Sequence, residues 1–203
     1  MLGKISFDEK LQTISTIYFG NCDQSFSEDD FRIIENDLNV TIPVALRKFY
    51  LMFGGRVDFL KCMYNITLPR EFYIENNVLM FAKEYQNVCA YGISIDTQKP
   101  IYFDISNDIN EPVDQEIEDF LLYMLAIQGT EFSPCVGKIS AKLATDLEEH
   151  LLKMSESSGE KAVFCSKDGV IGVIVGNEIF ISAKSDECME KFESDSGLEI
   201  DYL

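Results

Sequence analysis

The chain has 203 residues, of which 46% are hydrophobic and 26% are charged, so it can bury one sizeable core. It holds 17 Lys and Arg against 35 Asp and Glu, which gives a formal net charge of −18 at pH 7. This excess of negative charge excludes nucleic acid and anionic membranes as expected partners.

The first two predicted elements are helices. Residues 6–19 repeat apolar side chains near the helical spacing, which predicts a short amphipathic helix. Ser27 is a suitable N-cap for a second helix, because acidic residues fill the following turn and apolar residues recur three to four positions apart. We expect this helix to end near Asn39.

The segment 42–55 predicts a third helix with clear ends. Pro43 suits the first turn, and Gly54 with Gly55 predicts a left-handed termination. Its expected buried stripe consists of Leu46, Phe49, Tyr50 and Phe53.

The middle of the chain predicts strands followed by a helix. Residues 77–95 indicate two β segments around the stretch 84–87, and residues 100–106 indicate a third. A helix is then expected to begin around Glu111–Pro112, where acidic residues fill the first turn, and to continue to Gly129.

The last third predicts a helix, a meander and another helix. Residues 138–154 read as helical, and the stretch 155–161 is linker-like but too short to divide domains. Two-residue turns at Asp168–Gly169 and Gly176–Asn177 predict an antiparallel meander. The remaining expected elements are strands 162–166, 170–175 and 178–183, a helix 185–192 and a tail 198–202. The order favours an α+β fold, a single domain over residues 1–203 with a twisted, mainly antiparallel sheet flanked by helices.

Cysteine usage and the N-terminus predict a cytoplasmic protein. No CxxC pair occurs, and several cysteines stand inside apolar runs, so we expect reduced, structural thiols. No uncharged apolar run of about 18 residues is present, and Asp8 and Glu9 stand where a signal peptide needs its apolar stretch. The six cysteines are Cys22, Cys62, Cys89, Cys135, Cys165 and Cys188.

Catalytic and metal-binding patterns are weak, so we expect no enzyme, no metal and no cofactor. His150 is the single histidine and stands beside acidic residues in a helical pattern, which is typical of a surface residue. The stretch from Asp104 to Glu111 alternates oxygen ligands like the start of a calcium loop. It lacks the glycine at the sixth position, and Gln115 stands where a bidentate carboxylate is required.

Negative charge concentrates in the middle of the chain. Residues 71–134 contain 2 basic and 12 acidic side chains, and the acidic ones crowd the stretch from Asp104 to Asp119. A run of charge is most often a solvated face that maintains solubility. The alternative is a docking face for a basic partner.

Three segments carry a resemblance to the SUKH superfamily of bacterial toxin-immunity proteins and fungal cell-wall assembly regulators. They are LNVTIPVALRKFYLMFGG (38–55), FAKEYQNVCAYGISI (81–95) and KPIYFD (99–104). With the expected helix 111–125 they cover about residues 26–127, and the strands and helix of 138–203 fit less distinctively. Tyr91 stands where the family often has Trp, and we expect its ring to fill the core in the same way.

The resemblance implies an α+β protein that binds another protein and has no catalytic apparatus. Similar bacterial proteins neutralise a polymorphic toxin, commonly a nuclease with a basic surface, which an acidic face would attract and hold. Two alternatives stay open: a regulatory scaffold of the cell-wall assembly type, and a small-ligand-binding or enzymatic domain. The expected partner-binding residues are Asp104, Asp108, Glu111, Asp114, Glu116, Glu118 and Asp119.

Overall fold

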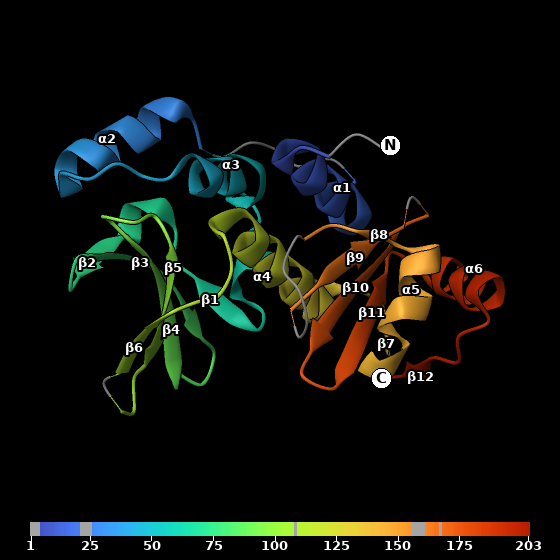
Figure 1. Ribbon diagram of the computed structural model, residues 1–203. Helices are drawn as coiled ribbons and strands as arrows, with labels where there is room; N and C mark the ends of the chain where they lie inside the picture. Colours follow the sequence, from blue (N-terminus) through green and yellow to red (C-terminus); the bar gives the residue numbers. More distant parts are fainter. Residues whose placement is uncertain (1–4, 21–25, 108, 156–160, 167) are drawn as a thin grey trace. The chain divides into compact units, whose positions relative to one another are not determined.

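The computed structural model describes residues 5–20, 26–107, 109–155, 161–166 and 168–203. Within these ranges the protein is α+β, with six α-helices and two antiparallel sheets, which confirms the expected fold class (Figure 1). The described residues fall into two compact units. Unit 1 comprises Met1–Asn21 and Leu122–Leu203, and unit 2 comprises Cys22–Leu121. The expectation of one domain over residues 1–203 stays a prediction.

Two predicted helices open unit 2. Helix α2 (Glu28–Leu38) begins at a capping box, in which the Ser27 hydroxyl accepts from the Asp30 backbone N–H and the Asp30 carboxylate accepts from the Ser27 backbone N–H. It ends at Asn39, whose φ of 52° is left-handed. Helix α3 (Val44–Phe53) buries the expected stripe of Leu46, Phe49, Tyr50 and Phe53.

The termination of α3 differs from the prediction. Gly54 has a φ of −61°, so it is right-handed and needs no special backbone freedom. Its role is steric, because a Cβ at this position would lie 2.5 Å from Cδ2 of the Phe26 ring. A glycine at the end of α3 therefore serves close packing against Phe26.

Sheet A belongs to unit 2 and has the strand order β1-β3-β4-β5-β6, with β2 also on β3. Strands β1 and β2 share one edge of β3, on either side of Phe81. Two short 3-10 turns, η1 (Phe59–Lys61) and η2 (Pro69–Glu71), connect into it. The strands are β1 (Tyr64–Ile66), β2 (Tyr73–Glu75), β3 (Val78–Glu84), β4 (Cys89–Ser94), β5 (Pro100–Asp104) and β6 (Ile109–Pro112).

Strand β6 replaces the expected start of the following helix. Glu111 pairs with Tyr102 and Pro112 with Ile101, while the Val113 backbone N–H donates to the Pro100 carbonyl at 2.9 Å. Pairing with β5 thus outweighs the helix-like acidic turn, and an edge strand tolerates Pro112 because proline lacks only an outward donor there. Helix α4 runs instead over Ile117–Phe132, beyond the expected end at Gly129.

Sheet B belongs to unit 1 and has the order β12-β7-β11-β10-β9-β8. The expected meander is confirmed, with a two-residue turn at Gly176–Asn177. The predicted helix over 138–154 is largely wrong, since only α5 (Ala144–His150) and the 3-10 turn η3 (Ala141–Leu143) are helical. The strands are β7 (Cys135–Ser140), β8 (Leu152–Lys153), β9 (Val163–Cys165), β10 (Val170–Val175), β11 (Glu178–Ala183) and β12 (Asp201–Tyr202).

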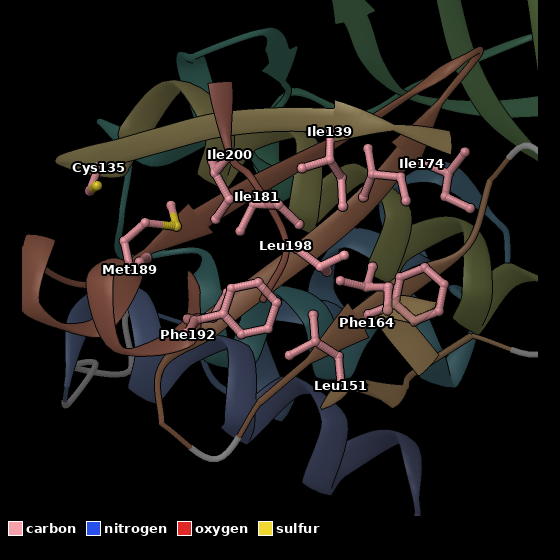
Figure 2. Close-up of a cluster of buried hydrophobic side chains, with 14 of the residues drawn as sticks. Cys135, Ile139, Leu151, Phe164, Ile174, Ile181, Met189, Phe192, Leu198 and Ile200 are labelled. Carbon is pink, nitrogen blue, oxygen red and sulfur yellow. The ribbon is translucent and has the colours of Figure 1, made fainter. Parts of the chain in front are cut away.

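One core of unit 1 lies between a face of sheet B and two helices. Leu147 comes from α5, and Met189 and Phe192 come from α6 (Asp186–Ser196), which begins at the Ser185 cap and extends one turn beyond the prediction. Figure 2 shows Met189 and Phe192 beside Ile181 and Ile200. Helix α1 (Phe7–Phe19) begins at a second capping box, and its Tyr18 hydroxyl hydrogen-bonds Ser182 Oγ of β11 at 3.0 Å.

Two expectations about the chain's chemistry can be compared with the described residues. Cys62, Cys89, Cys135, Cys165 and Cys188 are free thiols, and Cys22 lies outside the described ranges. None of the helices described is long and apolar enough to cross a bilayer.

Candidate protein-binding surface

The predicted partner-binding residues all belong to unit 2, but they differ in exposure. Glu111 of β6, Asp114 and Glu116 of the following connection, and Glu118 in the first turn of α4 are exposed. Asp108 lies outside the described residues. These four exposed carboxylates occur within eight consecutive residues, and we call them the acidic segment: Glu111, Asp114, Glu116 and Glu118.

Asp119 does not belong to the exposed surface. Its exposed fraction is 7%, and Phe120 and Leu121 beside it are also buried. The run of acidic residues predicted one solvated side of the helix, yet Asp119 faces the packed side. Burial therefore removes Asp119 from the predicted contact surface.

Asp104 is half-buried at the end of β5 and stabilises its own turn. Its Oδ1 accepts from the backbone N–H groups of Ser106 at 2.9 Å and Asn107 at 3.1 Å, and its Oδ2 accepts from Asn107 Nδ2 at 2.8 Å. The hydrogen bond from the Asn107 side chain is the main reason that the pKa of Asp104 is lowered. Asp104 thus remains negatively charged, with its oxygens already engaged locally.

Glu116 has a positively charged neighbour. Its Oε1 lies 3.4 Å from Lys99 Nζ, and both side chains are more than half exposed. An exposed ion pair of this kind contributes little to stability and is screened by salt. Glu116 can therefore exchange Lys99 for a cation of a partner.

Exposed apolar side chains that the sequence did not single out gather at one end of sheet A. We call these five residues the strand-end surface: Met63, Tyr85, Val88, Ile105 and Ile109. Tyr85 is 75% exposed, and the other four are 37–48% exposed. Large apolar residues beside turns are the sequence signal that could have identified them, since Tyr85 and Val88 flank the turn between β3 and β4.

The antiparallel pairing of sheet A explains why these residues lie at the same end of the sheet. Tyr85 follows β3 and Val88 precedes β4, while Ile105 follows β5 and Ile109 begins β6. The Tyr85 backbone N–H donates to the Met63 carbonyl at 3.2 Å, and the Ile105 N–H donates to the Val88 carbonyl at 3.0 Å. Ile109 pairs with Asp104, so its side chain lies at the same end of the sheet but on the face opposite to that of Ile105.

Three tyrosines form a row on one face of sheet A. The Tyr91 ring centroid lies 5.6 Å from that of Tyr64 and 5.7 Å from that of Tyr102, and 5.3 Å from that of Phe120 in α4. Tyr91 is half-buried and packs among these rings. Burial raises the pKa of Tyr91 well above its ordinary range.

Carboxylates lie near Tyr102, which is at the β5 end of this row. Glu111 pairs with Tyr102 across β5 and β6, so their side chains lie on the same face of the sheet. Desolvation raises the pKa of Tyr102, and Cys89 when ionised and the carboxylates of Asp104, Glu111 and Glu84 raise it further. The same end of sheet A therefore combines exposed apolar side chains with a negative potential.

A hollow in unit 1 is the feature that bears on the small-ligand alternative. His150, Asp168, Lys191 and Asp195 are among the residues that line it. Lys191 Nζ lies 3.1 Å from Asp168 Oδ2, and the hydrogen bond that Lys191 donates to this aspartate is the main cause of its raised pKa. Among the described residues of this hollow, the one lysine is thus already paired with a carboxylate.

Comparisons of the chain with protein-family models, curated proteins and solved structures found no match.

Proposed function

We propose that this protein is a non-catalytic, cytoplasmic immunity protein that neutralises a cognate polymorphic toxin, of the nuclease class, by direct binding. The resemblance of residues 26–127 to the SUKH superfamily suggests this role, and the charge of the chain supports it. A nuclease carries a basic groove for phosphates, and a protein of net charge −18 attracts such a groove and competes with nucleic acid for it.

The observation that carries the proposal is the exposure of the acidic segment. Its four carboxylates project from consecutive parts of unit 2, and one of them, Glu116, forms an exposed ion pair with Lys99. Carboxylates at neighbouring positions of the chain repel one another, and a cationic partner that lies over them relieves this repulsion. A basic protein surface supplies that compensation.

The test uses the purified C-terminal domain of the protein encoded by the gene immediately upstream. We expect the wild-type chain to bind this domain, to abolish its nuclease activity at equal concentration, and to associate more slowly as NaCl is raised. The triple variant Asp114→Lys, Glu116→Lys, Glu118→Lys should reduce the association rate about tenfold or more at low salt, measured by surface plasmon resonance.

A matched variant controls for net charge. Glu190→Lys, Asp195→Lys and Glu199→Lys change the net charge by the same amount at exposed positions of unit 1. This control should retain the association rate to within a few-fold. Equal losses in both variants would remove the assignment to the acidic segment, and absence of binding by the wild-type chain would remove the proposed function.

A further inference from the structure

We propose that the strand-end surface is the anchor of the complex, where it receives an aliphatic or aromatic side chain that the basic partner presents among its lysines and arginines. The proposal rests on the function proposed above and adds where the affinity resides. Acidic residues steer a partner and set its on-rate, whereas buried apolar anchors dominate the dissociation rate.

The clustering of exposed apolar residues supports this assignment. Fourteen large hydrophobic side chains are exposed in the described parts of the chain, and five of them occupy the strand-end surface. Scattered exposed apolar residues are normal, whereas several gathered at one end of a sheet are typical of a protein interaction site. Tyr85 has the largest exposed fraction in this set of fourteen, at 75%.

The backbone under these side chains is held in place before any partner arrives. Tyr85 is tied to Met63, Ile105 is tied to Val88, and Ile109 is paired with Asp104. The Asp104 carboxylate further fixes the turn after Ile105 through its bonds to Ser106 and Asn107. A preorganised surface loses little conformational entropy on binding, which favours high affinity.

The charge around the apolar residues specifies the chemistry of the occupant. Glu84 and Asp104 directly precede Tyr85 and Ile105 in the chain, so their carboxylates lie at the same end of sheet A. A second copy of this chain would bring its own surplus of carboxylates to the same place, because each copy has a net charge of −18. A basic partner instead pairs its cations with these carboxylates around the apolar contact.

The geometry of β6 favours side-chain docking over addition of a partner strand. The Val113 N–H donates to the Pro100 carbonyl, and hydrogen-bonding residues alternate along an antiparallel strand. The backbone N–H and C=O of Glu111 therefore point toward β5, whereas the backbone polar groups of Asn110 and Pro112 point outward. Pro112 has no N–H, so the outer edge lacks a donor at this position. A proline on an edge strand hinders strand pairing.

The experiment measures binding of the same purified toxin domain to substitutions within the strand-end surface. We expect Tyr85→Ala and Ile105→Ala to weaken binding about tenfold each, mainly by faster dissociation and to the same extent at low and high salt. Tyr85→Phe should retain most of the affinity, because the ring supplies the contact. Thermal melts establish that each variant remains folded.

Exposed residues of the same type elsewhere serve as controls. Tyr202→Ala and Ile33→Ala remove side chains that are 48% and 60% exposed, and both should leave dissociation unchanged. If Tyr85→Ala and Ile105→Ala bind the toxin domain as tightly as the wild-type chain does, the strand-end surface is not the anchor, and the proposed immunity function still stands. A wild-type chain that does not bind the domain removes both proposals.

Self-association is the remaining outcome. Analytical ultracentrifugation should give the same mass for the wild-type chain and for Tyr85→Ala. A wild-type dimer that Tyr85→Ala dissociates would assign the strand-end surface to contacts between copies and would contradict the proposal.

Discussion

At the scale of single residues, Asp104 illustrates how a predicted contact residue can have a local task. Its two oxygens accept three hydrogen bonds from the next turn, which lower its pKa and keep it ionised. The oxygens that a partner's cation would approach are already occupied in part. Asp104 therefore contributes negative potential and turn geometry more than a direct contact.

Asn107→Ala should raise the pKa of Asp104 toward the ordinary aspartate value, because the strongest of its hydrogen bonds is lost while the two backbone donors remain. A lowered folded-state pKa stabilises the protein above the unfolded-state value, and this stabilisation disappears as the pH falls through the folded-state value. The variant should thus lose less stability than the wild type on acidification below about pH 4.

The measurement is a carbon-13 titration of the Asp104 carboxyl group in both proteins. The Glu9 carboxyl, whose pKa is lowered by the Ser6 backbone and hydroxyl, serves as an internal reference that should not move. An Asp104 titration curve that is unaltered in Asn107→Ala would contradict the role of this side chain.

At the scale of elements, α4 contains a glycine that helix propensity alone does not explain. Gly129 was the expected C-terminal stop, yet the helix continues to Phe132. The ring of Tyr18 occupies the space that a Cβ at position 129 would need. The glycine therefore permits α1 and α4 to pack closely while the Tyr18 hydroxyl reaches Ser182.

Gly129→Ala should lower the free energy of unfolding by about 1–3 kcal/mol, the usual effect of overpacking a core. This sign is opposite to that expected inside an exposed helix, where alanine is favoured over glycine by about 1 kcal/mol. Urea denaturation would measure the change in the free energy of unfolding. Ser194→Ala in α6 is the control and should be close to neutral.

A double-mutant cycle identifies the cause. Tyr18→Ala combined with Gly129→Ala should destabilise by less than the sum of the two single changes, because the smaller side chain makes room for the new methyl group. If the effects of the two substitutions are strictly additive, the contact with Tyr18 is not the cause of the destabilisation by Gly129→Ala.

At the scale of the whole molecule, charge is the dominant property. The net charge of −18 and the pI of about 4.3 mean that the folded chain repels itself at neutral pH. Ion pairs such as Lys99–Glu116 and Arg32–Asp29 are largely exposed, so they offset little of this repulsion. Compactness is therefore maintained mainly by the apolar cores.

Raising NaCl from about 20 mM to about 300 mM at pH 7 should increase the melting temperature by several degrees, because salt screens repulsion within the folded state. Near pH 4.3 the same addition should have little effect, since the net charge is then close to zero. Calorimetry at the two pH values measures both results. A melting temperature that falls with salt at pH 7 would show that attractive ion pairs outweigh the repulsion.

Much of the local structure follows from short-range patterns. Ser27 caps a helix as expected, Asn39 ends α2 in the left-handed region, and the β9–β11 meander follows its turn residues. The errors occurred where distant pairing decides between two locally acceptable structures. Glu111–Pro112 resembles a helical first turn, yet β5 offers it partners, and residues 138–140 pair with β11.

The amino-acid sequence by itself determined the net charge, the helix caps, the alternating strands and the α+β class, because these depend on composition or on neighbours a few positions away. Tertiary structure decided that Asp119 is buried, that Gly54 and Gly129 serve packing, and that Met63, Tyr85, Val88, Ile105 and Ile109 lie at one end of sheet A. These outcomes depend on which strands become neighbours, and backbone pairing between residues far apart in the chain establishes that.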